Sequence, residues 1–86
     1  MDSAESWRHF FKAWPADIPK QGLVVTTFDE IIPFVNFMTS AGVLLVERDR
    51  PDANDARKIM ISFNAISAVK SRSTMDFDAY KAFGFA

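Results

Sequence analysis

Four aromatic side chains near the start of the chain recur with the spacing of an α-helix. They stand at positions i, i+3, i+4 and i+7: Trp7, Phe10, Phe11 and Trp14. This spacing places them on one face of a helix, and Asp2 stands where its side chain can cap the first turn. Pro15 marks the end, because the residue before a proline disfavours helical geometry. We therefore predict an amphipathic helix over residues 3–14 that packs against a sheet.

From residue 22 onward the pattern changes to that of β-strands. Five runs of apolar and β-branched residues are separated by polar breaks: residues 23–28, 31–39, 43–48, 58–63 and 66–70. Because side chains alternate along a strand, the second run would place Phe34 on the same face as Asn36 and Met38. By the same alternation, the fourth run would direct Met60 and Ser62 outward.

The polar segments complete the predicted outline. Residues 49–56 are rich in turn-forming residues and predict an exposed loop between the third and fourth strands. Residues 75–83 predict a short C-terminal helix, with Gly84 at its C-cap position. The chain is therefore predicted to be mainly β: an N-terminal helix, a five-stranded, strongly bent antiparallel sheet or small barrel over residues 22–70, and a short C-terminal helix, all in a single domain of residues 1–86.

The predicted order of elements and the closing strands resemble those of Sm-like proteins, a group of SH3-like small barrels. Ile61, Ile66 and Val69 fall on the aliphatic positions of the second Sm motif, and Asn64-Ala65 falls on its tight turn. Residues 37–46 are similar to the last part of the first motif. The resemblance covers about residues 3–70 in outline. It implies a ring in which the fourth strand of one subunit pairs with the fifth strand of the next.

The residues that bind RNA in Sm-like proteins are not matched. The Arg-Gly pair of the second motif falls on Ser62-Phe63, and the Asn of the first motif falls near Gly42. An Sm-like fold would therefore lack the usual uridine pocket. Strand pairing between subunits is carried by the backbone and needs no particular side chains, so the resemblance still implies assembly.

Composition adds to the expectation of self-association. Of the 86 residues, 49% are hydrophobic, and the chain holds nine Phe, two Trp and one Tyr. This is more aromatic surface than a small monomer readily hides. The net charge of −1 provides no general basic excess for nucleic acid. The acidic start, Met1 to Glu5, and the lack of an apolar run of about 20 residues predict a cytoplasmic protein with no membrane partner.

Candidate catalytic and metal-binding residues are few. Cysteine is absent, and the one histidine, His9, falls on the polar face of the predicted helix. Asp49, Asp52, Asn54 and Asp55 could supply oxygen ligands, but an EF-hand loop also needs a central Gly and a Glu at its twelfth position. The interleaved arginines favour an ordinary charged loop. We predict no enzyme activity, no metal site and no cofactor.

The leading hypothesis is a non-catalytic interaction or assembly module. It would self-associate into a homo-oligomer through edge strands and aromatic surface. The same surfaces could also bind another protein. The residues predicted for this interface lie on the first helix and the closing strands: Trp7, Phe11, Met60, Ser62 and Ser67. Trp and Phe are frequent among the residues that dominate binding energy.

Two alternatives come from other features of the sequence. A nucleic-acid-binding Sm-like protein could use a non-standard basic rim made of Arg48, Arg50, Arg57, Lys58 and Lys70. A sensor of small molecules or peptides could use an apolar pocket beneath the N-terminal helix. An RNA partner is not favoured over self-association, because acidic residues interleave with the basic ones in residues 48–58.

Overall fold

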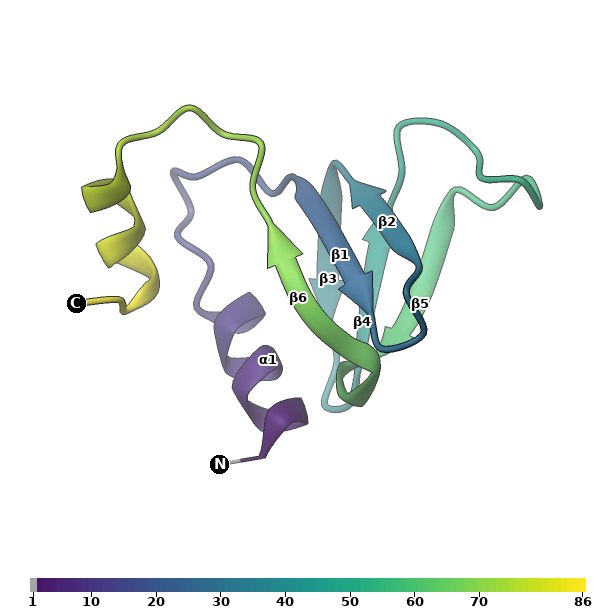
Figure 1. Ribbon diagram of the computed structural model, residues 1–86, viewed down its shortest axis with the longest axis horizontal. Helices are drawn as coiled ribbons and strands as arrows, with labels where there is room; N and C mark the ends of the chain where they lie inside the picture. Colours follow the sequence, from purple (N-terminus) through teal and green to yellow (C-terminus); the bar gives the residue numbers. More distant parts are fainter. Residues whose placement is uncertain (1) are drawn as a thin grey trace.

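A single α-helix opens the fold in the computed structural model, which describes residues 2–86 (Figure 1). Helix α1 spans Ser3–Lys12, and the Asp2 carboxylate accepts a hydrogen bond from the Glu5 amide at 2.8 Å. The helix ends two residues earlier than predicted, in a tightened last turn where the Trp14 amide bonds to the Phe11 carbonyl. No helix within residues 2–86 is long and apolar enough to cross a membrane.

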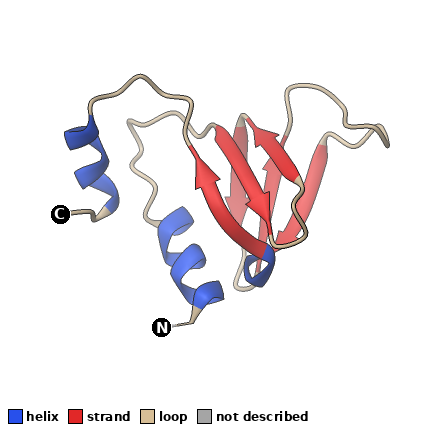
Figure 2. Cartoon of the chain, in the orientation of Figure 1, coloured by secondary structure: helices blue, strands red, loops and turns tan. Residues whose placement is uncertain are grey.

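Six strands follow, one more than predicted. Their bounds are β1 Gly22–Thr26, β2 Ile31–Phe34, β3 Asn36–Thr39, β4 Val43–Glu47, β5 Lys58–Ser62 and β6 Ile66–Lys70. They form two antiparallel three-stranded sheets, with strand orders β2-β1-β6 and β3-β4-β5 (Figure 2). The mainly β class with antiparallel strands and an N-terminal helix is confirmed, whereas the prediction of five strands in one bent sheet or small barrel is wrong.

The extra strand arises because the predicted second run divides at Val35. Phe34 and Phe37 are both buried, although strict alternation would put them on opposite faces. The Val35 amide donates to the Glu47 carbonyl at 2.8 Å, and the Asn36 side chain accepts from the Phe37 amide. The chain therefore leaves the first sheet after Phe34 and enters the second sheet with a shifted alternation.

A 3-10 turn, η1 (Phe63–Ala65), passes the chain from β5 back to the first sheet. It falls on the tight connection predicted at Asn64-Ala65. The Phe63 amide donates to the Gly42 carbonyl, and the Thr27 amide donates to the Ala65 carbonyl. The turn is therefore bonded to the residue after β1 and to the residue before β4.

The core lies between the two sheets and beneath α1. Phe11 is only 2% exposed, and its ring lies 6.3 Å from Phe34 of β2, 5.0 Å from Phe37 of β3 and 6.3 Å from Phe63 of η1. The other buried hydrophobic residues come mainly from alternate positions of the strands: Val24, Ile32, Leu44, Val46, Ile61 and Ile66. The helix thus closes the space where the two sheets meet.

The C-terminal segment forms a 3-10 helix, η2 (Phe77–Phe83), rather than the predicted helix over residues 75–83. Gly84 ends it in the left-handed conformation, as expected for a C-cap glycine. Figure 1 shows η2 folding back alongside α1, and Phe83 stacks on Phe10 with ring centroids 5.1 Å apart. None of its residues is fully buried.

Gly22 should be required by the close approach of β1 to β6. A Cβ atom at this position would lie 2.7 Å from the Lys70 carbonyl oxygen, whereas one at Gly42 would meet nothing within 4 Å. We expect Gly22→Ala to lower the free energy of unfolding by about 1–3 kcal/mol through overpacking. Chemical denaturation measures the loss, with Gly42→Ala as the matched control; equal stability of the two variants would contradict this prediction.

Phe11 should contribute more to stability than any exposed aromatic residue. We expect Phe11→Ala to lower the free energy of unfolding by about 3–5 kcal/mol. Phe28 is 64% exposed, so Phe28→Ala should change the free energy by less than about 0.5 kcal/mol. Thermal and urea unfolding compare the two variants, and a small loss for Phe11→Ala would show that α1 is not needed for the core.

Candidate functional site

The outer face of the β3-β4-β5 sheet carries a row of apolar side chains. Leu45 of β4 stands directly opposite Met38 of β3 and Met60 of β5 in the strand register. Met38 and Met60 are each 68% exposed, and Leu45 is half-buried between them. We refer to Met38, Leu45 and Met60 as the apolar row.

Alternation along β4 explains why the row points outward. Leu44 and Val46 are buried, so the residues between and beside them lie on the opposite face of the sheet. A shallow hollow of about 130 Å³ lies beside the row, over β3, β4 and β5. At its end Lys58 and Glu47 form a cross-strand salt bridge at 3.0 Å. Both side chains are exposed, so this pair contributes only about 0.2–1 kcal/mol.

The row ends at a free sheet edge. Within the described residues β5 pairs only with β4, and β6 pairs only with β1, so each has one unpaired edge. Both strands are five residues long. An unpaired edge presents backbone donors and acceptors to a further strand.

The structure brings together two of the five predicted interface residues. Met60 and Ser62 lie on the exposed face of β5. Phe11 is in the core, where it cannot contact a partner, and Trp7 packs partly against that core. The Ser67 hydroxyl donates to the Val25 and Thr26 carbonyls of β1, so it is occupied within the chain. Of the five predicted interface residues, Met60 and Ser62 are therefore the two whose side chains lie on the same exposed strand face.

The predicted basic rim is divided between the two sheets. Arg48, Arg50 and Arg57 lie in or beside the β4–β5 loop, where the Arg48 amide donates to the Arg57 carbonyl and the Arg48 Nε to the Arg50 carbonyl. Lys58 is paired with Glu47. Lys70 ends β6 in the other sheet. These five residues therefore do not form one continuous patch by strand position.

Asp52 organises the β4–β5 loop. Its carboxylate accepts hydrogen bonds from the Asn54 amide at 2.8 Å and the Ala56 amide at 2.9 Å. The Ala56 bond, then the Asn54 bond and the nearby Arg48 charge hold the pKa of Asp52 below its usual value. Across residues 2–86, no group of three or more His, Cys, Asp or Glu side chains could hold a metal ion. His9 is exposed on α1.

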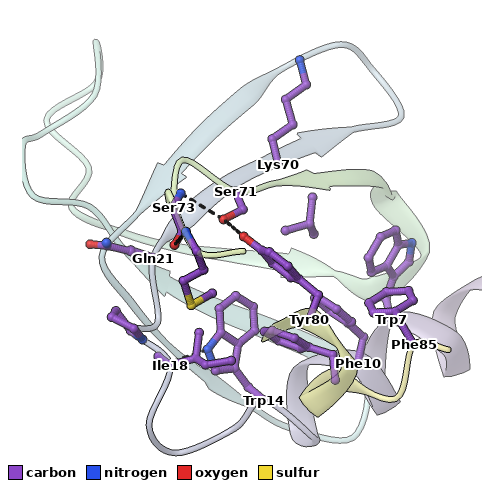
Figure 3. A pocket seen from close by; sticks show the side chains of 14 residues that line it. Trp7, Phe10, Trp14, Ile18, Gln21, Lys70, Ser71, Ser73, Tyr80 and Phe85 are labelled. Carbon is purple, nitrogen blue, oxygen red and sulfur yellow. Dashed lines mark hydrogen bonds between the residues drawn. The ribbon is translucent and has the colours of Figure 1, made fainter. Parts of the chain in front are cut away.

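A second candidate site lies between α1, the end of β6 and η2 (Figure 3). It is a cavity of about 240 Å³ lined by Trp7, Phe10, Trp14, Ile18, Pro19, Gln21, Val69, Lys70, Ser71, Ser73, Met75, Tyr80, Phe83 and Phe85. The sensor alternative predicted an apolar pocket beneath the N-terminal helix, but it did not include the C-terminal residues in that pocket. Tyr80 and Phe83 are spaced by one helical turn, which is the only local signal that both could face the same neighbour.

The pocket has rigid aromatic walls. Phe10 and Tyr80 each stack with Phe83, with interplanar angles of 14° and 18°. The Trp14 ring meets Phe83 edge-on at 4.9 Å, and its indole Nε1 donates to the Ile18 carbonyl. One polar contact stands at the edge of the pocket, where the Ser71 and Tyr80 hydroxyls lie 2.9 Å apart.

Protonation of Asp52 should loosen the β4–β5 loop. Folding lowers its pKa, so its contribution to stability is complete above the unfolded value of about 3.9 and is lost as the pH falls through the lower folded value. We expect the Asn54 and Ala56 amide resonances to titrate together with a midpoint below about 3.9. Asp52→Asn should abolish this titration while keeping an acceptor; a midpoint at or above the unfolded value would contradict the prediction.

Comparison of the chain with protein-family models, with curated proteins and with solved structures found no match. No activity, ligand or partner therefore comes to this chain from a relative. The apolar row with its free edge and the aromatic pocket are the two arrangements from which a function can be inferred. Each rests on the positions and contacts of the residues described above.

Proposed function

We propose that this protein is a non-catalytic assembly module that self-associates through the free edge of β5 and the apolar row. One observation carries the proposal: the row of Met38, Leu45 and Met60 runs across the sheet and ends on an unpaired edge strand. A second copy that pairs with this edge would satisfy backbone groups and cover methionine surface in the same contact.

Strand β5 lacks the features that usually prevent edge pairing. Edge strands are commonly protected by proline, bulges or inward charges. Strand β5 contains no proline, its register with β4 is continuous, and its one charged residue is already paired with Glu47. Pairing at such an edge is governed by the backbone, and the side chains of alternate positions determine the partner.

The unpaired edges of β5 and β6, two of the four edge strands, support a head-to-tail contact, in which β5 of one copy pairs with β6 of the next. Such contacts use two different surfaces and give closed rings or open filaments. This is the contact implied by the resemblance to Sm-like proteins. The strand orders β2-β1-β6 and β3-β4-β5, joined by a divided strand and a 3-10 turn, are compatible with that relation to small barrels.

The proposal that the module is non-catalytic is supported by two polar side chains that form hydrogen bonds within turns. Asp52 caps backbone amides in the loop. The buried Thr26 hydroxyl accepts from the Glu30 amide. These hydrogen bonds stabilise turns, and neither directs a nucleophile or a base toward a cavity.

A charge on the apolar row should dissociate the assembly. We expect the wild-type protein to have a mass that is a multiple of 9.7 kDa and Met60→Asp to have the monomer mass, because pairing would bury the new carboxylate without a partner. Light scattering during size-exclusion chromatography at low and high salt measures both masses.

The control is Phe28→Asp, which charges a residue of nearly equal exposure, 64% against 68%, outside the row. It should keep the wild-type mass. A monomeric wild-type protein, or an oligomer that Met60→Asp leaves intact, would overturn the proposal. Circular dichroism of Met60→Asp confirms that a change of mass does not come from unfolding.

A further inference from the structure

The size of the aromatic pocket limits what it can hold. Its volume is about 240 Å³. A dry cavity of roughly 150 Å³ accepts benzene, whereas pockets for drug-sized ligands begin near roughly 300 Å³. The cavity therefore suits a molecule larger than one aromatic ring and smaller than a typical cofactor. Stacked rings on the Phe10, Phe83 and Tyr80 side favour a flat occupant.

The charge of the lining points to a neutral occupant. Lys70 is the only charged residue among those that line the pocket. In Figure 3 its amine points away from the aromatic rings. The lining therefore offers no group that would balance a carboxylate or an ammonium inside the cavity, and burying an unpaired charge is costly.

The polar edge of the pocket selects an acceptor oxygen. The Ser71 hydroxyl lies 2.9 Å from the Tyr80 hydroxyl and also accepts from the Ser73 amide at 3.1 Å. Whichever hydroxyl donates within the pair, the other keeps a free O–H. That O–H can donate to a hydroxyl or carbonyl oxygen of a bound molecule. The Trp14 N–H is already bonded to the Ile18 carbonyl.

We propose that the cavity between α1, β6 and η2 is a binding site for a neutral, planar, two-ring aromatic molecule that carries one hydroxyl or carbonyl group. The rings would lie against Phe10, Phe83 and Trp14, and the oxygen would accept a hydrogen bond from the Ser71–Tyr80 pair. This site does not include the apolar row, but Val69 and Lys70 at the end of β6 line it.

The two tryptophans of the chain make the site directly observable. Trp7 and Trp14 both line the cavity, and the sequence contains no other tryptophan. In a ¹⁵N-labelled full-length sample, both indole N–H resonances therefore report on this site. We expect 2-naphthol to shift both resonances saturably at fixed protein concentration, and naphthalene to shift them with weaker affinity.

Three variants separate the parts of the proposal. Met75→Trp should fill the cavity and weaken 2-naphthol binding at least about tenfold, whereas Ala53→Trp in the exposed β4–β5 loop should leave it unchanged. Tyr80→Phe keeps the ring and removes the hydroxyl. It should weaken the binding of 2-naphthol about three- to tenfold, which is the change expected for the loss of one hydrogen bond. The binding of naphthalene should weaken less than about twofold.

Several results would overturn the proposal. Unsaturable or absent shifts in the wild type would show that the cavity takes no such ligand. If Met75→Trp bound 2-naphthol as tightly as the wild type, the ligand would lie elsewhere. The same would follow if Ala53→Trp lost as much affinity as Met75→Trp. Indole shifts on dilution of Met60→Asp without any probe would show that a second copy fills the cavity independently of the β5–β6 contact. A monomeric protein that binds 2-naphthol as described would overturn the assembly proposal and leave this one standing.

Discussion

The packing of the Phe11 ring holds the separate parts of this fold together. The two sheets share no strand, and each has its own hydrogen-bonded ladder. Phe11 contacts one aromatic ring from each sheet, Phe34 and Phe37, and a third from the turn that joins them, Phe63. A small domain buries a limited fraction of its surface, so one large side chain at this junction accounts for much of what keeps the helix and both sheets in one unit.

The same division of the sheets determines which surfaces stay exposed. A closed barrel has no unpaired strand edge, whereas two three-stranded sheets leave β5 and β6 each with an unpaired edge. The helix covers the core side only, so the outer face of β3-β4-β5 keeps its methionines exposed. The aromatic pocket has a different origin, because it exists only where the C-terminal segment folds back on α1.

The local sequence pattern was sufficient to predict those elements whose residues have the same surroundings along their length. The helical placement of Trp7, Phe10 and Phe11 and the alternation in β5, including the outward direction of Met60, are confirmed. Alternation failed at Val35, because its amide donates to the carbonyl of Glu47, twelve residues away, and this hydrogen bond divides the strand. The pocket residues were missed for the same reason, since the stacking of Phe10 on Phe83 joins opposite ends of the sequence.

The step at Val35 has a consequence for the shape of the whole chain. Val35 and Asn36 both face Glu47, so two residues of one strand oppose one residue of its neighbour. This is the arrangement of a β-bulge, in which one residue is inserted into a regular ladder. Without Val35, Phe34 and Phe37 would fall on the same face of a single uninterrupted strand. This inserted residue marks the point where the chain passes from the β2-β1-β6 sheet to the β3-β4-β5 sheet.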